Sequence, residues 1–222
     1  MSNAARTSAT SSSRGIQRSH IVWASLMLAM AGVGGLLLLS EHERQLGVLP
    51  AAVQTEASTI TISDALSSSA PLATERWSGI VIHHSGAVSG SPQGLAQEHE
   101  ELGLRGLGYH FVLCNGRGAP DGEIHVGYRW DQQLPGAHAV GPNADFYNAR
   151  AIGICLIGDG ERRAFTEAQM VRLTELVSAI QERTGIPDAD VRLHRDIAST
   201  PSPGRLFPEA AFKARLAASR AR

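Results

Sequence analysis

The segment AIGICLIGDG, residues 151–160, constrains the fold more than any other stretch of this sequence. Its first seven residues are apolar or glycine without interruption. A strand with one face in water alternates polar and apolar side chains, whereas a strand covered on both faces is apolar almost throughout. We therefore expect a central strand here with helices on both faces, which indicates an α/β or α+β domain.

Other segments carry strand patterns. GIVIHHSG, residues 79–86, is a short β-branched run that ends in His83, His84 and a Ser-Gly turn. GYHFVLCNG, residues 108–116, alternates two sets of side chains, and EIHVGYRW, residues 123–130, follows a turn-rich segment. We expect these last two segments to pair as a hairpin.

The clearest helix is expected to begin at a capping box of Thr166 and Gln169 and to end before Gly185. Its apolar stripe consists of Met170, Leu173, Leu176, Val177 and Ile180. Two further helices are expected, one over residues 91–103 and one after Pro208. The sequence thus predicts an α/β (α+β) domain built on a single mixed β-sheet flanked by helices.

The amino-terminal part contains an uncharged apolar run, residues 21–39, that is long enough to cross a hydrocarbon core of about 30 Å. Arginines precede it and glutamates follow it, so the positive-inside tendency leaves the amino end in the cytoplasm. A cleaved signal peptide is the alternative, with Ala29-Met30-Ala31 as its small-residue site. Either arrangement exports the rest of the chain.

These features divide the chain into four parts. Residues 1–20 are a basic and polar cytoplasmic segment, 21–39 a transmembrane anchor, 40–77 a Ser/Ala/Thr-rich linker, and 78–217 the globular domain. The expected location is the inner (cytoplasmic) membrane, spanned once, with the domain in the periplasm or cell-wall space.

Charge and cysteine content exclude some classes of function. The formal net charge is -1, with 20 Lys and Arg against 21 Asp and Glu, so there is no basic excess of the kind that nucleic-acid binding favours. Cys114 and Cys155 both lie in apolar runs without metal-binding spacing, which favours buried, unpaired thiols. A bridge between them stays open, because geometry decides it.

His83 follows one strand and His194 follows another short apolar run, so both are candidates for the same edge of a sheet. Neutral imidazole is the commonest metal-binding side chain. Widely separated histidines carry no local ligand signature, however, so a metal site and two structural histidines are equally compatible with the spacing.

Four motifs together resemble the type 2 N-acetylmuramoyl-L-alanine amidases and the peptidoglycan recognition proteins, a family that includes amidase-type phage lysozymes. They are IVIHHSG, GLGYHFVL, GAHAVGPNADFYNARAIGICLIGD and HRDIASTPSPG, in the family's order between Gly79 and Pro208. The resemblance implies a mixed sheet with a groove for peptidoglycan. In the enzymes of this family it also implies one zinc ion held by two histidines and a cysteine or aspartate.

Carried over to this chain, the resemblance assigns His83 and His194 as zinc ligands and puts the third ligand at Ser202. A neutral serine hydroxyl is a much poorer zinc ligand than a thiolate or a carboxylate. Asp196 or another nearby carboxylate could replace it, although a loop cap is the commoner role for Asp196. Alternatively, the two histidines could hold zinc weakly with extra water. His84 is expected to point to the opposite face from His83.

The resemblance also assigns catalytic and substrate-binding roles. Tyr109 and Thr200 match residues that support the reacting water or the oxyanion, and His138 and Asn148 match positions beside the substrate in the groove. Either of the last two residues could instead order its own loop. Some members carry a catalytic glutamate where this chain has Cys155, which argues against that mechanism here.

The resulting hypothesis is a zinc-dependent, monomeric peptidoglycan amidase that hydrolyses the bond between N-acetylmuramic acid and L-alanine in cell-wall turnover, with muropeptides as ligands. The alternative is a non-catalytic peptidoglycan-binding receptor or tether, because Ser202 replaces the expected third ligand. A protein-interaction module on the same fold is a third reading, since fold does not fix function.

Overall fold

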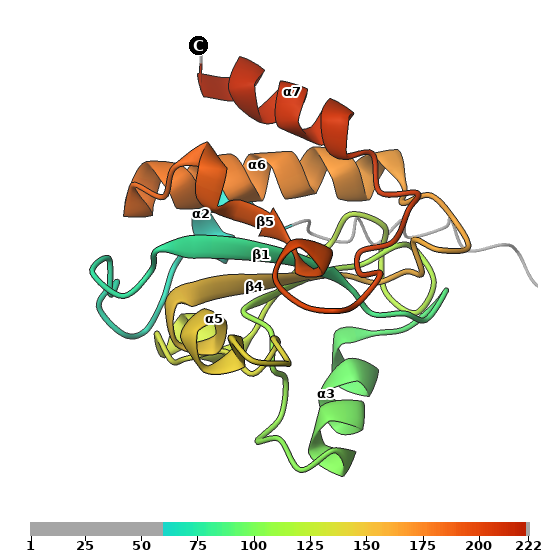
Figure 1. Ribbon diagram of the computed structural model, residues 1–222, viewed down its shortest axis with the longest axis horizontal. Helices are drawn as coiled ribbons and strands as arrows, with labels where there is room; N and C mark the ends of the chain where they lie inside the picture. Colours follow the sequence, from blue (N-terminus) through green and yellow to red (C-terminus); the bar gives the residue numbers. More distant parts are fainter. Residues whose placement is uncertain (1–59, 221–222) are drawn as a thin grey trace, which may run out of the picture. The chain divides into compact units, whose positions relative to one another are not determined.

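A computed structural model describes residues 60–220 of the chain (Figure 1). Its centre is a five-stranded sheet with the strand order β3-β2-β4-β1-β5. The strands are β1 (Gly79–His84), β2 (Phe111–Leu113), β3 (Ile124–Val126), β4 (Ala151–Leu156) and β5 (Val191–Leu193). Strand β3 pairs antiparallel with β2, while the other neighbours run parallel, so the expected mixed sheet and its hairpin are confirmed.

Helices cover both faces of the sheet. The helices are α2 (Ile62–Ala65), α3 (Pro92–Glu101), α4 (Tyr128–Asp131), α5 (Ala144–Arg150), α6 (Glu167–Thr184) and α7 (Glu209–Arg220). Two 3-10 turns, η1 (Asp188–Asp190) and η2 (His194–Asp196), flank β5. Figure 1 shows α6 and α7 above the sheet and α3 and α5 below it.

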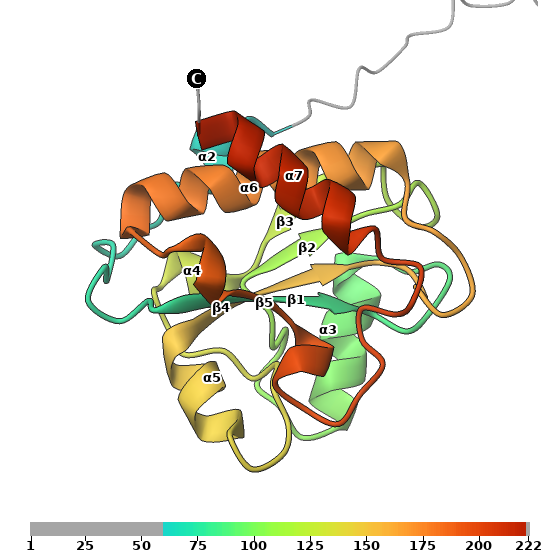
Figure 2. The same ribbon diagram turned by 45° about the horizontal axis from the view of Figure 1, so that its top comes forward.

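The main hydrophobic core lies between the sheet and α6. All six residues of β4 are buried, as the apolar run predicts for a central strand. Helix α6 begins with the expected capping box of Thr166 and Gln169 and ends at Gly185, whose φ of 75° is the left-handed conformation that glycine adopts most readily. In the turned view of Figure 2, α7 crosses over the outer side of α6.

Alternation along β1 gives the two faces of the sheet different contents. Ile80 and Ile82 enter the main core, so Val81 and His83 face the side of α3 and α5. Cys155, the partner of His83 across the β1–β4 ladder, belongs to a smaller apolar cluster under α3. The functional candidates are therefore held on one face by strands whose other face is anchored in the core.

The folded part begins upstream of residue 78, where the sequence put the end of a linker. Ala65 and Leu66 are buried in the main core, and Trp77 donates from Nε1 to Gln133 Oε1 over 2.8 Å. From about residue 60 onward, this Ser/Ala/Thr-rich segment therefore packs against the domain, although its composition is typical of a linker. The apolar run 21–39 and the segments before residue 60 lie outside the described residues. Within residues 60–220, no helix has both the length and the apolar character that crossing a bilayer requires.

The two cysteines are buried and free, so the bridge that the sequence left open is not formed. Burial raises the pKa of Cys155, and it raises that of Cys114 to about 11. Both thiols are neutral at physiological pH, which fits the structural role expected for them.

Candidate functional site

His83 and His194 come together at the carboxyl ends of two neighbouring strands. His83 is the second-last residue of β1, and His194 is the first residue of η2, directly after β5, which runs parallel to β1. Their ring centroids are 4.2 Å apart, and the residues are only 1% and 8% exposed. Parallel pairing therefore unites two histidines that are 111 positions apart in the sequence.

Each of these rings keeps one nitrogen without a hydrogen-bond partner. The atoms are His83 Nδ1 and His194 Nε2, and both are fully buried. An unsatisfied buried polar group costs about 1 to 3 kcal/mol, so a ligand that engaged both nitrogens would remove that cost. Burial lowers the pKa of both histidines, which keeps the rings neutral and leaves lone pairs for a Lewis acid.

Ser202 does not supply an anionic third ligand. Its side chain is buried, and its Oγ accepts a hydrogen bond from the backbone N–H of His84 over 3.1 Å. Asp196 does not replace it, because its Oδ2 accepts from Leu193 N over 2.9 Å and closes the η2 turn. Between residues 60 and 220, no cluster of three His, Cys, Asp or Glu side chains is arranged to hold a metal ion.

The donor set therefore fits zinc through two imidazole nitrogens and leaves the remaining positions to neutral ligands. Neutral imidazole suits zinc, but thiolate or carboxylate ligands normally complete such sites. The two orphaned nitrogens of His83 and His194 are the structural observation in favour of an ion. The neutral hydroxyl of Ser202 at the third-ligand position is the observation against tight zinc binding.

Tyr109 lies beside this pair. Its ring centroid is 5.1 Å from that of His83, and the residue is partly exposed. Burial raises the pKa of Tyr109 well above its usual value, with a smaller contribution from the Cys155 thiol. The phenol therefore stays protonated, and its hydroxyl is hydrogen-bonded to the Cys155 thiol, a weak partner that a substrate oxygen would replace.

His138 is drawn into the same cluster. Its Nδ1 is 3.0 Å from His83 Nε2, and its Nε2 is 3.1 Å from the carbonyl oxygen of Ala151. Burial lowers the pKa of His138 to about 4, so the ring is neutral at physiological pH. Sequence reasoning assigned His138 to the groove but missed its contact with His83, because nothing local links positions 55 apart.

Asn148 holds the loop that carries His138. Its Oδ1 accepts from the backbone N–H groups of His138 and Ala139, each over 2.8 Å, and its Nδ2 donates to the Ala139 carbonyl. This is the loop-ordering role that the sequence left open beside substrate binding. Whether Asn148 also contacts substrate stays a prediction.

Thr200 lies on the turn that leads from η2 to Ser202. Its Oγ1 accepts from the backbone N–H of Ser202 over 3.2 Å. The partly exposed hydroxyl retains its own proton for donation. Its expected role at the oxyanion stays a prediction.

His84 faces away from the cluster, as alternation predicts. Its Nδ1 accepts from the backbone N–H of Gly160 over 3.0 Å, on the opposite side of the strand from His83.

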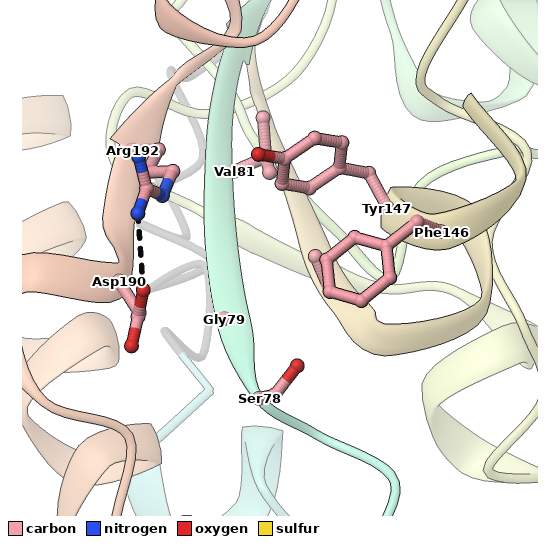
Figure 3. A pocket seen from close by; sticks show the side chains of 8 residues that line it. Ser78, Gly79, Val81, Phe146, Tyr147, Asp190 and Arg192 are labelled. Atoms are coloured by element: carbon pink, nitrogen blue, oxygen red, sulfur yellow. Dashed lines mark hydrogen bonds and ion pairs between the residues drawn. The ribbon is translucent and has the colours of Figure 1, made fainter. Parts of the chain in front are cut away.

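A cavity of about 280 Å³ lies on the histidine face of the sheet but nearer the start of β1. Figure 3 shows Phe146 and Tyr147 of α5 on one side of β1 and Asp190 and Arg192 on the other. Its lining is Ser78, Gly79, Val81, Phe146, Tyr147, Ala151, Asp190 and Arg192. The histidines do not line it. At 3.3 Å per residue, His83 lies about 13 Å further along the strand from Gly79.

Comparison with known proteins gives consistent matches. The family model described as N-acetylmuramoyl-L-alanine amidase matches residues 73–205. An endolysin of Enterobacteria phage K11 is 30% identical over 112 residues, and one of Escherichia phage T7 is 31% identical over 114 residues. Each alignment covers 49% of this chain and 66% of the endolysin, so the chain spans just under two thirds of these relatives.

Solved structures share the fold. An endolysin N-acetylmuramoyl-L-alanine amidase from Clostridium intestinale URNW is 31% identical, with a TM-score of 0.56 over 68% of this chain and 91% of that one. A Drosophila peptidoglycan recognition protein is 23% identical, with a TM-score of 0.50 over 61% of this chain and 77% of that one. The second likeness concerns the fold alone.

Proposed function

Because this chain belongs to the N-acetylmuramoyl-L-alanine amidase family, we propose that it is a zinc-dependent amidase of peptidoglycan. The bond to be hydrolysed is the amide between N-acetylmuramic acid and L-alanine. The proposal includes the anchor at residues 21–39, with the domain held outside the cytoplasmic membrane, where peptidoglycan is found.

The observation that carries the proposal is the pair of bare nitrogens on His83 and His194. A protein that only gripped peptidoglycan would gain nothing from burying two unsatisfied imidazole nitrogens on rings whose centroids are 4.2 Å apart. A metal ion held by His83 and His194 would offset that penalty, because it would accept a lone pair from each ring. The neutral state of both rings supports the same role.

An amide resists hydrolysis unless the nucleophile is activated and the oxyanion is stabilised. When bound, zinc supplies a Lewis acid that polarises the carbonyl and lowers the pKa of water toward about 7. The side chains do the rest: Tyr109, protonated beside His83, donates a hydrogen bond to the developing oxyanion. Thr200 is the second donor, from the turn before Ser202. A well-placed donor contributes roughly 2.7 to 4 kcal/mol in comparable sites.

The cavity near the start of β1 supports a substrate longer than a single amide. It lies on the same face of the sheet as His83, flanked by the aromatic rings of Phe146 and Tyr147. A muropeptide whose scissile bond sits at the histidines extends its stem peptide along β1 toward this cavity. The strand alternation that puts Val81 and His83 on one face supports this placement.

A non-catalytic peptidoglycan receptor is the second candidate, and Ser202 favours it. The serine is neutral, and its Oγ is already engaged with the His84 backbone N–H. A site with two neutral ligands holds zinc weakly, and a chain that lost its metal would keep the groove and lose turnover.

Two measurements on the full-length protein, purified in mild detergent, separate these candidates. The first is zinc content by mass spectrometry, and the second is release of stem peptides from purified muropeptides with added zinc. We expect zinc-dependent release that chelators abolish and that His194→Ala lacks. Binding to insoluble cell wall without any released peptide, at saturating zinc, would establish the receptor instead. Ser202→Cys is the matched control that restores an anionic ligand.

A further inference from the structure

The contacts of His138 reveal a role beyond the groove position assigned to it. Resting on the proposed zinc site, we propose that His138 is a positioning residue that fixes the proton of His83 on Nε2. His83 Nδ1 is thereby left as a bare lone pair that is available to a metal ion. Two hydrogen bonds connect the groups in a series, which runs from the Ala151 carbonyl through the His138 ring to the His83 ring.

The donor and the acceptor of each hydrogen bond in the series follow from whether each atom is able to donate a proton or only to accept one. The carbonyl oxygen of Ala151 only accepts, so His138 Nε2 must carry the proton of their 3.1 Å contact. The neutral ring of His138 then has an acceptor at Nδ1. His83 Nε2, 3.0 Å away, must donate to that acceptor. A neutral imidazole carries one proton, so His83 Nδ1 has none.

The position of the orphaned atom agrees with this assignment. His83 Nδ1 is buried and has no partner, whereas His83 Nε2 and both nitrogens of His138 are engaged. Read in this tautomer, the orphan is a lone pair and not an N–H. The same series in reverse would bury an unsatisfied N–H donor at Nδ1, pointing at no acceptor.

The His138 ring is held too closely to turn over. A Cβ built on Gly136 would lie 2.3 Å from His138 Cδ2, and one built on Gly153 would lie 2.4 Å from the same atom. Both glycines therefore let the backbone approach the ring closely, where any side chain would collide with it. From helix α5, Asn148 Oδ1 accepts a hydrogen bond from the backbone N–H of His138 over 2.8 Å and so fixes the main chain that carries the ring.

These contacts hold the His138 imidazole in one orientation and one tautomer. Metal-binding histidines generally donate their second ring N–H to a carboxylate, carbonyl or water, and removing that acceptor weakens metal binding by roughly 10- to 100-fold. Here the acceptor is a second imidazole whose own tautomer is set by a main-chain carbonyl. The arrangement contains no charged group, so it adds no negative charge to a site that already lacks an anionic third ligand.

The test uses the full-length chain, stripped of metal and carrying 15N-labelled histidine. Long-range 1H–15N spectra report which ring nitrogen of His83 is protonated, and His83→Ala identifies the signal. We expect the Nε2–H tautomer in the parent protein and loss of that preference in His138→Leu. Zinc affinity, measured against a chromophoric chelator, should fall roughly 10- to 100-fold in the same variant.

His138→Gln is the matched variant, because its amide offers both an acceptor and a donor. We expect it to recover most of the tautomer preference and of the zinc affinity, which mere space-filling would not achieve. A parent protein with His83 protonated on Nδ1 overturns the inference. So does a folded His138→Leu variant with unchanged tautomer and unchanged zinc affinity.

The outcome is separable from that of the proposed function. If the parent protein shows the expected tautomer and binds zinc but releases no stem peptide, the positioning role of His138 is supported and the amidase proposal fails. If it binds no zinc, the amidase proposal fails as well. The spectrum of the metal-free protein then decides by itself whether His138 sets the tautomer of His83.

Discussion

At the scale of single residues, the charge of the ligands decides how the site behaves. His83 and His194 contribute two neutral nitrogens, and Ser202 contributes no charge. A bound zinc ion would thus keep its full double charge in a largely buried place. Under the proposed function, such an ion would polarise a substrate strongly but be held weakly, so we expect metal supply to control activity.

Replacing Ser202 by cysteine should therefore raise zinc affinity by at least about tenfold, because a thiolate adds both charge and a softer donor. Ser202→Ala separates ligand from structural roles. If the hydroxyl only accepts from the His84 N–H, zinc affinity should be unchanged while stability falls by about 1 to 3 kcal/mol. Competition titrations and urea unfolding measure the two effects. A large drop in zinc affinity for Ser202→Ala would instead make the serine a ligand.

Tyr109→Phe addresses the oxyanion. Loss of a single well-placed donor should lower the amidase rate by roughly 100- to 1000-fold. Zinc content should stay the same, because the hydroxyl is not a ligand. Muropeptide hydrolysis at saturating substrate, together with metal analysis, checks both statements. A rate within a factor of three of the parent protein would remove Tyr109 from the chemistry.

At the scale of elements, the local strength of a pattern decides what the sequence reveals. Helix α6 was predictable because a capping box, an apolar stripe and a terminal glycine all agree. Helix α5 was not, because it is seven residues long, has no buried residue and no side-chain cap. Histidines at strand ends were predictable as neighbours, but the His83–His138 contact was not, since it depends on how a long loop folds back.

The capping box at the start of α6 should contribute measurably to the stability of the protein. Thr166 Oγ1 accepts from Gln169 N over 3.0 Å and donates to Asp121 Oδ1 over 2.6 Å. Thr166→Ala removes both contacts and should destabilise the protein by about 1 to 2 kcal/mol. Thr166→Ser keeps the hydroxyl and should lose much less. Chemical unfolding of the two variants side by side is the measurement, and equal losses would mean that the methyl group, not the cap, is responsible.

At the scale of the whole molecule, the sheet separates an apolar face from a histidine-rich one. The α6 side is packed with aliphatic and aromatic residues, while His83, His110 and His138 are buried on or beside the α3–α5 side. Among residues 60–220, all seven histidines have a pKa below the usual value, and burial is the first cause in each. The fold therefore resists protonation at each of these histidines.

This resistance predicts that the domain loses stability in mild acid. His110 lies away from the proposed zinc ligands and makes a clear test: burial lowers its pKa from 6.5 to about 3, and its Nδ1 accepts from Gly153 N over 2.9 Å. Below pH 6.5 the unfolded chain binds protons that the folded state refuses, so stability falls as pH drops from 6.5 toward about 3 and is flat above.

Between pH 6.5 and 4.5 the contribution of His110 alone is about 2 to 3 kcal/mol. Urea unfolding of the metal-free protein, followed by the fluorescence of buried Trp77 and Trp130, measures the slope. His110→Asn keeps an acceptor for Gly153 N without a titrating ring, so its pH dependence should be shallower by about that amount. The same slope in both proteins would show that His110 does not govern acid sensitivity, and would move the effect to the histidines around His83.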